Sequence, residues 1–224
     1  MNNLLISGVG KVGKKIYDLA ESFGFSVICC IDKNRFEKVD CPIYSSFDEV
    51  KENIDLIIDF SSDDLCNQAI DYALKNKCAF LCGTTALSEK TLNKINELAK
   101  ISPVCVASNF SKGVIVLNKL AETAINSLPE FDLELVEAHN RLKKDAPSGT
   151  AKRLAEHLSI SKVHSLRGGD VAGVHTIYLF GNGEEIAITH RAYDKIIFAR
   201  GALCVAVELL NKSAGFYLAE ELLK

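Results

Sequence analysis

The chain has 224 residues, 48% of them hydrophobic and 25% charged, and its formal net charge is −3. This is a globular composition, long enough for one large domain or two small ones. The sequence lacks the basic excess that would indicate a nucleic-acid partner. It also lacks the long uncharged apolar run that would predict a membrane span. The N-terminus lacks the charged start and small-residue cleavage site of a secretory signal, so we expect a cytoplasmic protein.

Apolar segments alternate with helical patterns over the first half of the chain. The predicted strands are residues 4–6, 26–31, 54–60, 78–82 and 103–107. The predicted helices follow the first, third and fourth of these strands, and they cover residues 12–23, 63–75 and 88–100. Strands that are apolar throughout and alternate with helices are typical of a parallel sheet covered on both faces.

The pattern changes after Phe110 and predicts a second domain that is rich in antiparallel strands. The predicted elements are helices at 113–127 and from Ser148 onwards, strands at 132–138, 174–180 and 185–189, and a helix at 196–210 that closes the chain. The last two strands are joined by Gly181-Asn182-Gly183, which predicts a β-hairpin.

The eight cysteines form neither a Cys-x-x-Cys pair nor a spacing with histidine that is typical of a zinc site. Those that lie in apolar runs are Cys29, Cys30, Cys78, Cys82, Cys105 and Cys204. Cys78 and Cys82 share a face of a predicted strand without forming a chelate. We interpret the cysteines as small, buried, reduced side chains and expect no metal.

A glycine motif, Gly8-Val9-Gly10-Lys11-Val12-Gly13, lies between the first predicted strand and the following helix. Such glycines let the backbone approach a pyrophosphate, which the helix N-terminus attracts. The second strand ends at Asp32, nineteen residues after Gly13 and close to the spacing of about 20 that is typical of a ribose-binding carboxylate. A tight turn with a solvated aspartate is the alternative. The combination of strand, glycines, helix and acid favours a Rossmann-like dinucleotide site.

The residues after Asp32 leave the choice of nucleotide open. Asp32 favours the free ribose hydroxyls of NADH and would repel the 2′-phosphate of NADPH. Lys33 and Arg35 could pair with that phosphate, or they could lie in a solvated loop. We expect the protein to use both nucleotides, with NADH favoured.

Two further loops follow predicted strand ends, where ligands of open parallel sheets bind. We expect these loops to reach the nicotinamide and its ribose. Their residues are Gly83, Thr84 and Thr85 in the first loop, and Ala107, Ser108, Asn109 and Phe110 in the second.

The window from Glu137 to Ala151 reads Glu-Ala-His-Asn-Arg-Leu-Lys-Lys-Asp-Ala-Pro-Ser-Gly-Thr-Ala. A histidine such as His139 can give up a proton near neutral pH, and Lys143 can hold an anion or donate a proton. The segment 148–150 opens a helix, whose first backbone N–H groups can bind an anion. The window therefore predicts a proton-donating pocket for a small acid. A solvated lysine pair and a surface histidine are the alternatives.

These motifs resemble the dihydrodipicolinate reductase family over nearly the whole chain. The glycine motif is shared by many folds, whereas the window 137–151 is highly specific. The other matching segments are 59–61, 83–85, 107–111, 167–170, 173–175, 188–191 and 198–201.

The resemblance implies NAD(P)H-dependent reduction of 4-hydroxy-tetrahydrodipicolinate (dihydrodipicolinate) to tetrahydrodipicolinate, in lysine and diaminopimelate biosynthesis. Hydride addition to this cyclic unsaturated imine leaves negative charge on the substrate, so a proton must arrive. His139 matches the family's proton donor, and Lys143 matches its second catalytic residue. The family's site for the substrate carboxylate is matched by Ser148, Gly149 and Thr150, with the charge of Lys143 nearby.

Two domains follow from the pattern and the resemblance. Residues 1–111 with 196–224 are expected to form the Rossmann-like α/β domain that binds the dinucleotide. Residues 112–195 are expected to form an α+β domain with a mixed, largely antiparallel sheet, which binds the substrate. The family also implies a homotetramer joined through the sheets of this second domain.

Three positions depart from the family pattern. Many relatives carry a second histidine after the catalytic one, which assists substrate binding, where this chain has Asn140. An amide still hydrogen-bonds a carboxylate but carries no charge, so we keep Asn140 in the expected substrate site. Ala86 stands where glycine is usual, and Ser108 replaces a more typical residue. Because His139 and Lys143 remain, we expect an active enzyme.

Two other functions are compatible with a dinucleotide site. An aspartate or diaminopimelate dehydrogenase has a similar build but would lack the window 137–151. A non-catalytic NAD(P)-sensing protein would bind nucleotide without turnover, and it has no use for a histidine and a lysine beside an anion site.

Overall fold

The computed structural model describes residues 1–33 and 39–223, and the chain divides into two compact units. Unit 1 comprises residues 1–110 and 198–224, and unit 2 comprises residues 111–197. Arg35, which we considered for phosphate binding, lies outside the described residues. Among the residues described, no helix combines the length and the apolar character that crossing a membrane requires.

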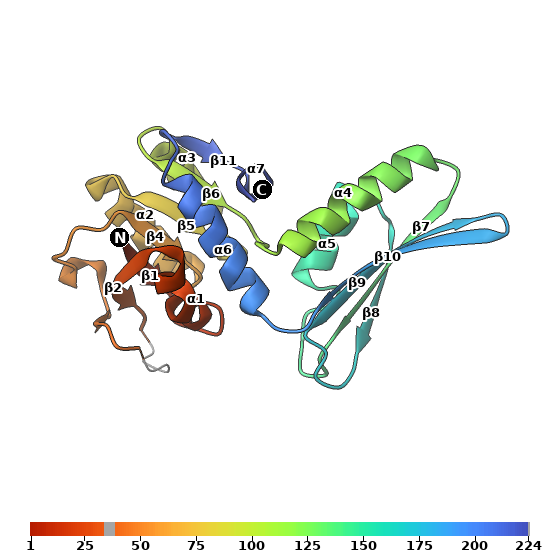
Figure 1. Ribbon diagram of the computed structural model, residues 1–224, viewed down its shortest axis with the longest axis horizontal. Helices are drawn as coiled ribbons and strands as arrows, with labels where there is room; N and C mark the ends of the chain where they lie inside the picture. Colours follow the sequence, from red (N-terminus) through yellow and green to blue (C-terminus); the bar gives the residue numbers. More distant parts are fainter. Residues whose placement is uncertain (34–38, 224) are drawn as a thin grey trace. The chain divides into compact units, whose positions relative to one another are not determined.

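Unit 1 is built on a parallel sheet, which has seven strands in the described part of the chain (Figure 1). In spatial order these are β11 (Gly215–Tyr217), β6 (Pro103–Val106), β5 (Ala79–Cys82), β4 (Leu56–Asp59), β1 (Asn2–Ser7), β2 (Phe25–Ile31) and β3 (Ile43–Tyr44). The chain runs outward from β1 through β2 to β3, and it then returns to β4 on the other side of β1. In open parallel sheets, ligands bind at the carboxyl ends of the strands where the order reverses in this way.

Helices cover both faces of this sheet (Figure 1). They are α1 (Gly13–Ala20) and α6 (Ile196–Leu209) on one face, and α2 (Asp63–Asn76) and α3 (Glu89–Ala99) on the other. Alternate residues of β1 enter separate cores, since Leu4 and Ile6 pack with α1 and α6 while Leu5 packs with α2 and α3. Burial on both faces explains why the strands of this unit are apolar throughout.

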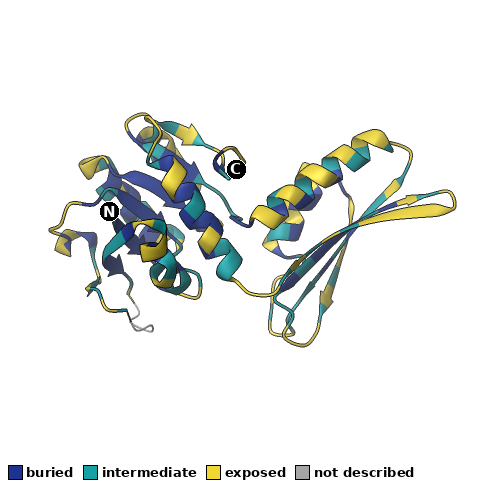
Figure 2. Cartoon of the chain, viewed as in Figure 1, coloured by how far each residue is buried: buried dark blue, intermediate teal, exposed yellow. Residues whose placement is uncertain are grey.

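Unit 2 packs two helices, α4 (Lys112–Ser127) and α5 (Gly149–His157), against a mixed four-stranded sheet. The strands lie in the order β10 (Glu184–Ala192), β9 (Gly173–Gly181), β7 (Asp132–His139) and β8 (Lys162–Arg167). β9 pairs antiparallel with both β10 and β7, whereas β7 and β8 are parallel. Residues of β7 and β9 are buried in the unit-2 core, while most of β10 is exposed (Figure 2).

The expected fold class is confirmed by these two sheets, but several elements were not predicted. They are β3, β8, β11, α7 (Ala219–Leu222) and the single-turn helix η2 (Phe47–Glu49), whereas the predicted helix at 12–23 is divided into α1 and the single-turn helix η1 (Glu21–Phe23). The prediction that the helix at 196–210 closes the chain is wrong, because β11 and α7 follow it. β11 has only three residues and is defined by its pairing with β6, so no local periodicity marks it in the sequence.

Ala86 follows the loop after β5 and adopts a left-handed backbone conformation, with φ of +58°. The clash of a Cβ with the backbone makes this conformation cost about 1–2 kcal/mol for residues other than glycine. The strain gives a physical reason for glycine to be usual at this position.

We expect the substitution Ala86→Gly to raise the free energy of unfolding by about 0.5–1 kcal/mol, because glycine adopts positive φ without that clash. Urea denaturation followed by circular dichroism measures the change. Ala99→Gly, at the last residue of α3, is the control and should lower the same quantity by about 0.5–1 kcal/mol. A lower stability of Ala86→Gly would contradict the strain.

Candidate active site

The glycine motif connects β1 to α1 where the strand order of unit 1 reverses. Gly8 has φ of +85°, and a Cβ there would lie 2.5 Å from the backbone oxygen of Phe60. A Cβ at Gly13 would lie 1.9 Å from the backbone oxygen of Gly8. These two glycines let the loop fold tightly. A Cβ at Gly10 would meet nothing within 4 Å, so this residue borders open space that a pyrophosphate could enter.

The acid at the end of β2 lies beside the same loop. Oδ2 of Asp32 accepts a hydrogen bond from the backbone N–H of Val9 at 2.7 Å. Lys11 and Val12 complete the turn before α1. A glycine loop, a helix start and a carboxylate together fit a dinucleotide.

Lys33 forms an exposed ion pair with Asp64 at the start of α2. Its Nζ lies 2.9 Å from Oδ2 of Asp64. The hydrogen bond from Lys33 lowers the pKa of Asp64, so this carboxylate is charged at neutral pH. The ammonium group considered for a 2′-phosphate therefore already has an acidic partner.

A buried carboxylate, Asp59 at the end of β4, organises the next two loops. Its Oδ2 accepts a hydrogen bond from Oγ of Ser61 at 2.7 Å, and its Oδ1 accepts one from the hydroxyl of Thr84. The backbone N–H of Ser61 donates to Oγ1 of Thr84 at 2.8 Å. Burial raises the pKa of Asp59. Gly83, Thr84 and Thr85 are thus attached to the neighbouring strand end through one side chain.

The loop after β6 adjoins the loop after β5. The backbone N–H of Ala107 donates to the oxygen of Cys82 at 3.0 Å, and Ser108 and Asn109 follow with half-buried side chains. Phe110 is buried, and its ring centre lies 5.8 Å from that of Phe60. The structure therefore brings the four loops predicted to hold the nucleotide to one edge of the sheet, after β6 and β5 on one side of β4 and after β1 and β2 on the other.

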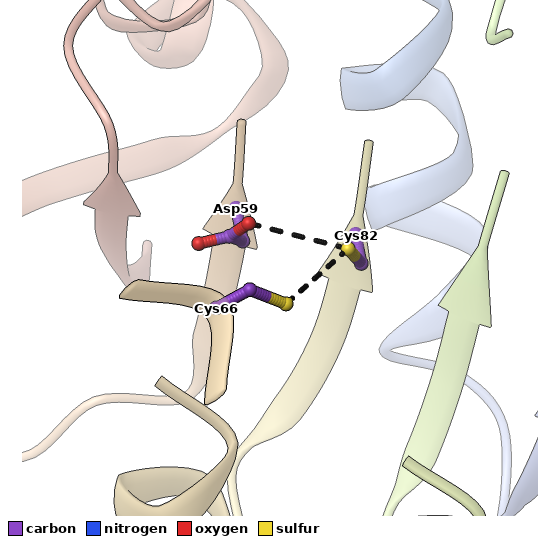
Figure 3. A group of neighbouring side chains, drawn as sticks. All are labelled: Asp59, Cys66 and Cys82. Atoms are coloured by element: carbon purple, nitrogen blue, oxygen red, sulfur yellow. Dashed lines mark hydrogen bonds between the residues drawn. The ribbon is translucent and has the colours of Figure 1, made fainter. Parts of the chain in front are cut away.

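Asp59 also belongs to a buried cluster with Cys66 and Cys82 (Figure 3). Possible ligand atoms of the three residues lie within 4.8 Å of one another, and the two Sγ atoms are 3.6 Å apart. The hydrogen bond to Cys82, followed by burial, raises the pKa of Cys66. The raised pKa favours the protonated thiol of Cys66, whereas metal binding needs a thiolate, so we assign no metal to the cluster. Sequence spacing did not indicate it, because only the fold brings Cys66 to Cys82.

His139 is the last residue of β7, and Glu137 holds its ring. The two residues are two apart on one strand, so their side chains share a face. Nδ1 of His139 lies 2.5 Å from Oε2 of Glu137. A Cβ at Gly173 would lie 3.1 Å from Nε2 of His139, so the glycine leaves space at the second ring nitrogen.

The carboxylate of Glu137 is fully buried and receives several hydrogen bonds. Arg167 donates from Nη1 to Oε2 at 2.9 Å and from Nη2 to Oε1 at 2.7 Å. The backbone N–H of Ser148 donates to Oε1 at 3.1 Å. Burial alone raises the pKa of Glu137, but its hydrogen bonds, led by those from Arg167, outweigh burial and lower it to about 2. Glu137 is therefore a carboxylate at neutral pH.

Lys143 and Asn140 lie in the loop between β7 and α5. Nζ of Lys143 pairs with Oδ1 of Asp145 at 2.8 Å, and the Lys143 side chain keeps about a quarter of its surface exposed. The amide oxygen of Asn140 accepts from the backbone N–H of Leu142 at 3.1 Å. The Asn140 side chain therefore stabilises the turn, besides its expected contact with substrate.

Ser148 caps α5, as the sequence indicated. Its Oγ accepts from the backbone N–H of Ala151 at 3.2 Å, and Nε2 of the buried His175 lies 3.2 Å from the same oxygen. The backbone N–H of Ser148 donates to Glu137. The backbone N–H groups that follow it at the helix start are those of Gly149 and Thr150.

The sequence alone did not indicate that Glu137, Arg167 and His175 belong to the site. One signal could have found Glu137. Glu137 precedes His139 by two residues on a predicted strand, which places both side chains on one face. His175 is the antiparallel partner of Glu137, and Arg167 is the parallel partner of His139, but those pairings required the strand order.

Family models described as "Dihydrodipicolinate reductase, N-terminus" and "Dihydrodipicolinate reductase, C-terminus" match residues 2–110 and 113–223. The chain belongs to the dihydrodipicolinate reductase family. This membership makes it an oxidoreductase, and it confirms the family identified from the motifs.

Two relatives that are similar in sequence agree with this assignment, and a solved structure shares the fold. A 4-hydroxy-tetrahydrodipicolinate reductase of Caldanaerobacter subterraneus subsp. tengcongensis is 36% identical over 249 residues, which cover 100% of this chain and 99% of that protein. The enzyme of the same name from Thermosipho africanus is 38% identical over 216 residues, covering 96% and 94%. A dipicolinate-bound dihydrodipicolinate reductase from Paenisporosarcina sp. TG-14 has a TM-score of 0.82 at 20% identity and covers 99% of each chain.

An aspartate dehydrogenase from Thermotoga maritima shares the fold at a TM-score of 0.57 and 15% identity, covering 92% of this chain and 95% of that one. At this identity the likeness extends to the fold alone. The reductases, in contrast, match in sequence over almost the whole chain.

Burial makes His175 a source of pH-dependent stability. Burial, and next the nearby His139, lower the pKa of His175 to about 4, whereas an unfolded histidine has a pKa of about 6.5. Between these values the unfolded chain binds more protons than the folded one. The free energy of unfolding should therefore fall as the pH falls from 6.5 to 4.

We expect His175→Gln to flatten this pH dependence, because glutamine does not titrate. Urea denaturation at several pH values between 7 and 4 measures the slope. His164→Gln is the control, because His164 lies on β8 with about half of its side chain exposed. A slope that is unchanged in His175→Gln would contradict the assignment.

Proposed function

We propose that the protein reduces 4-hydroxy-tetrahydrodipicolinate to tetrahydrodipicolinate with NADH or NADPH, in lysine and diaminopimelate biosynthesis, and that His139 is the proton donor. Family membership supports the reaction. The observation that best supports the role of His139 is its Nδ1 contact with a fully buried carboxylate, which leaves Nε2 on the side of Gly173.

The chemistry of the imine assigns a task to this histidine. The bound nucleotide supplies a hydride, and hydride addition to the conjugated imine leaves negative charge on the substrate. His139 gives a proton from Nε2 to the substrate and keeps its second proton on Nδ1, next to Glu137. A positioned general acid contributes about 10²–10⁴-fold in rate.

The substrate site that we propose lies around the start of α5. The dipicolinate-bound relative supports a small dicarboxylate as the ligand. We assign one carboxylate to Ser148, Gly149 and Thr150, where a helix start attracts anions. Lys143 supplies positive charge, and the amide of Asn140 is a further donor.

We assign the nucleotide to the loops at the carboxyl strand ends of unit 1. The residues are Gly8, Val9, Gly10, Lys11, Val12, Gly13, Asp32, Lys33, Gly83, Thr84, Thr85, Ala107, Ser108, Asn109 and Phe110. The contact of Asp32 with the glycine loop and the ion pair of Lys33 with Asp64 both favour NADH over NADPH, with use of both retained.

We further propose a cytoplasmic homotetramer that assembles through the sheet of unit 2. That sheet exposes Leu166, Phe180 and Ile186, whose apolar surface a second sheet could cover. Eight free cysteines, most of them buried, suit a reducing compartment.

A non-catalytic NAD(P)-sensing protein is the second candidate, and the surroundings of His139 argue against it. A buried carboxylate that holds one histidine nitrogen, with space at the other, serves proton transfer rather than nucleotide binding.

We expect His139→Ala to lower kcat by about 10²–10⁴-fold, because the proton donor is lost. Lys143→Ala should also lose most of its turnover, because the charge that holds the substrate is removed. Both variants should bind NADH as the wild type does. The assay supplies the condensation product of aspartate semialdehyde and pyruvate and follows the absorbance of NADH and NADPH. His157→Ala, an exposed histidine of α5, is the control and should remain active.

If the wild type oxidises neither nucleotide with this substrate, the proposed reaction is wrong. If His139→Ala turns over at the wild-type rate, the reaction stands and the proton donor is another group.

We expect Asp64→Asn to lower KM for NADPH by up to about fivefold, because Lys33 is released to meet the 2′-phosphate and exposed ion pairs are worth at most about 1 kcal/mol. KM for NADH should stay the same. Initial rates with each nucleotide measure the change. Asp71→Asn, which breaks an ion pair between α2 and Lys94, is the matched control. An equal effect on both nucleotides would contradict this role of Lys33.

A further inference from the structure

The two oxygens of Glu137 have different partners. Oε2 faces Nδ1 of His139 and receives Nη1 of Arg167, whereas Oε1 receives the backbone N–H of Ser148 and Nη2 of Arg167. One rigid, planar group therefore lies between the proposed proton donor and the proposed anion site at the start of α5. Arg167 bonds to both oxygens and fixes the rotation of the carboxylate, since paired N–H groups match a carboxylate in a single plane.

The hydrogen bond that Glu137 accepts determines which nitrogen of a neutral His139 carries the proton. An ionised carboxylate accepts hydrogen bonds and cannot donate one, so Nδ1 must carry hydrogen. When the ring is protonated, Nε2 carries the second proton, which can be given away on the side that Gly173 leaves open. After that proton has left, the ring is neutral and already in its stable tautomer.

Arg167 extends the same arrangement to the loop that carries Lys143. Its Nη2 also donates to the backbone oxygen of Asp145 at 2.6 Å, and Asp145 pairs with Lys143. The proton donor, the loop cation and the helix start thus all connect to one buried ion pair.

We propose that Glu137, held by Arg167, is a positioning residue that sets the tautomer of His139 and fixes its place relative to the anion site. The proposal rests on His139 as the proton donor. Glu137 takes no proton and touches no substrate in this scheme.

Glutamine at position 137 would conflict with this pattern of donors. If the amide NH₂ replaced Oε1, it would face two donors, Ser148 N–H and Arg167 Nη2. If it replaced Oε2, it would face Nη1 of Arg167 and Nδ1 of His139, and only His139 can respond. His139 would respond by moving its proton to Nε2, so that Nδ1 accepts from the amide.

The test is Glu137→Gln in protein labelled with ¹⁵N-histidine. We expect the neutral His139 ring to change from the Nδ1–H to the Nε2–H tautomer, which ¹⁵N chemical shifts distinguish. We expect kcat to fall by about 10²–10⁴-fold, the contribution of a general acid. Affinity for dipicolinate should weaken by about threefold to tenfold, as for the loss of one hydrogen bond. KM for NADH should stay the same.

Glu134→Gln is the matched control. Glu134 lies on the same strand and bonds a histidine and a cation of β8, with Oε2 2.8 Å from His164 and Oε1 3.1 Å from Lys162. It keeps about a quarter of its side chain exposed, and its hydrogen bonds to Lys162 and His164 lie outside the proposed site. This variant should retain wild-type kcat and the Nδ1–H tautomer of His139.

The outcomes separate this proposal from the proposed function. If His139→Ala is inactive while Glu137→Gln keeps the Nδ1–H tautomer and a kcat within about threefold of wild type, positioning by Glu137 is overturned and the donor stands. If His139→Ala is fully active, the donor is wrong and the positioning proposal falls with it.

Arg167→Lys is a second test of positioning by Glu137, for use if Glu137→Gln does not fold. A lysine keeps the charge but cannot bond both oxygens in one plane. We expect His139 to keep its Nδ1–H tautomer, dipicolinate to bind about threefold to tenfold more weakly, and kcat to fall by about tenfold, since the spacing of the site is loosened. Wild-type values for both dipicolinate affinity and kcat would overturn the proposal.

Discussion

A carboxylate without solvent exposure lies within unit 2, and the geometry around it depends on how its charge is stabilised. An unpaired buried carboxylate costs several kcal/mol, so Glu137 is tolerated only with its donors in place. Those donors come from β7, β8 and the start of α5. The charge is therefore stabilised only when all three elements have assembled. The geometry of the site around His139 is therefore fixed when these three elements pack together, and it does not depend on flexible side chains moving afterwards.

Unit 1 follows a different constraint, because its loops are placed by the sheet. Parallel strands buried on both faces end at a common edge, and each loop begins there. Asp59 repeats on a smaller scale what Glu137 does in unit 2, since one buried acid connects two loops. Both units thus use a carboxylate that is shielded from water to hold backbone segments that local sequence leaves free.

What the sequence predicted and what it missed have a common physical explanation. Five strands of unit 1, β1, β2, β4, β5 and β6, were found because burial on both faces makes each one an apolar run, whereas the short edge strands β3 and β11 were missed. His139, Lys143 and Ser148 could be proposed as site residues because they lie in one short window. β8 was missed because its exposed face carries Lys162, His164 and Leu166. This mixture of charged and apolar residues hides the polar–apolar alternation that predicts a strand. The contact of Glu137 with Arg167 spans 30 residues along the chain, and it exists only once β7 and β8 pair.

The lowered pKa of Glu137 limits which groups of the site can accept and transfer a proton. With a pKa of about 2, this carboxylate cannot accept the Nδ1 proton and pass it on, so no relay runs through it. If His139 is the proton donor as proposed, a single proton per turnover is then available, and it leaves from Nε2. Its replacement must return to the same nitrogen from solvent once the product has gone. Under the proposed mechanism, recharging of His139 is thereby tied to product release.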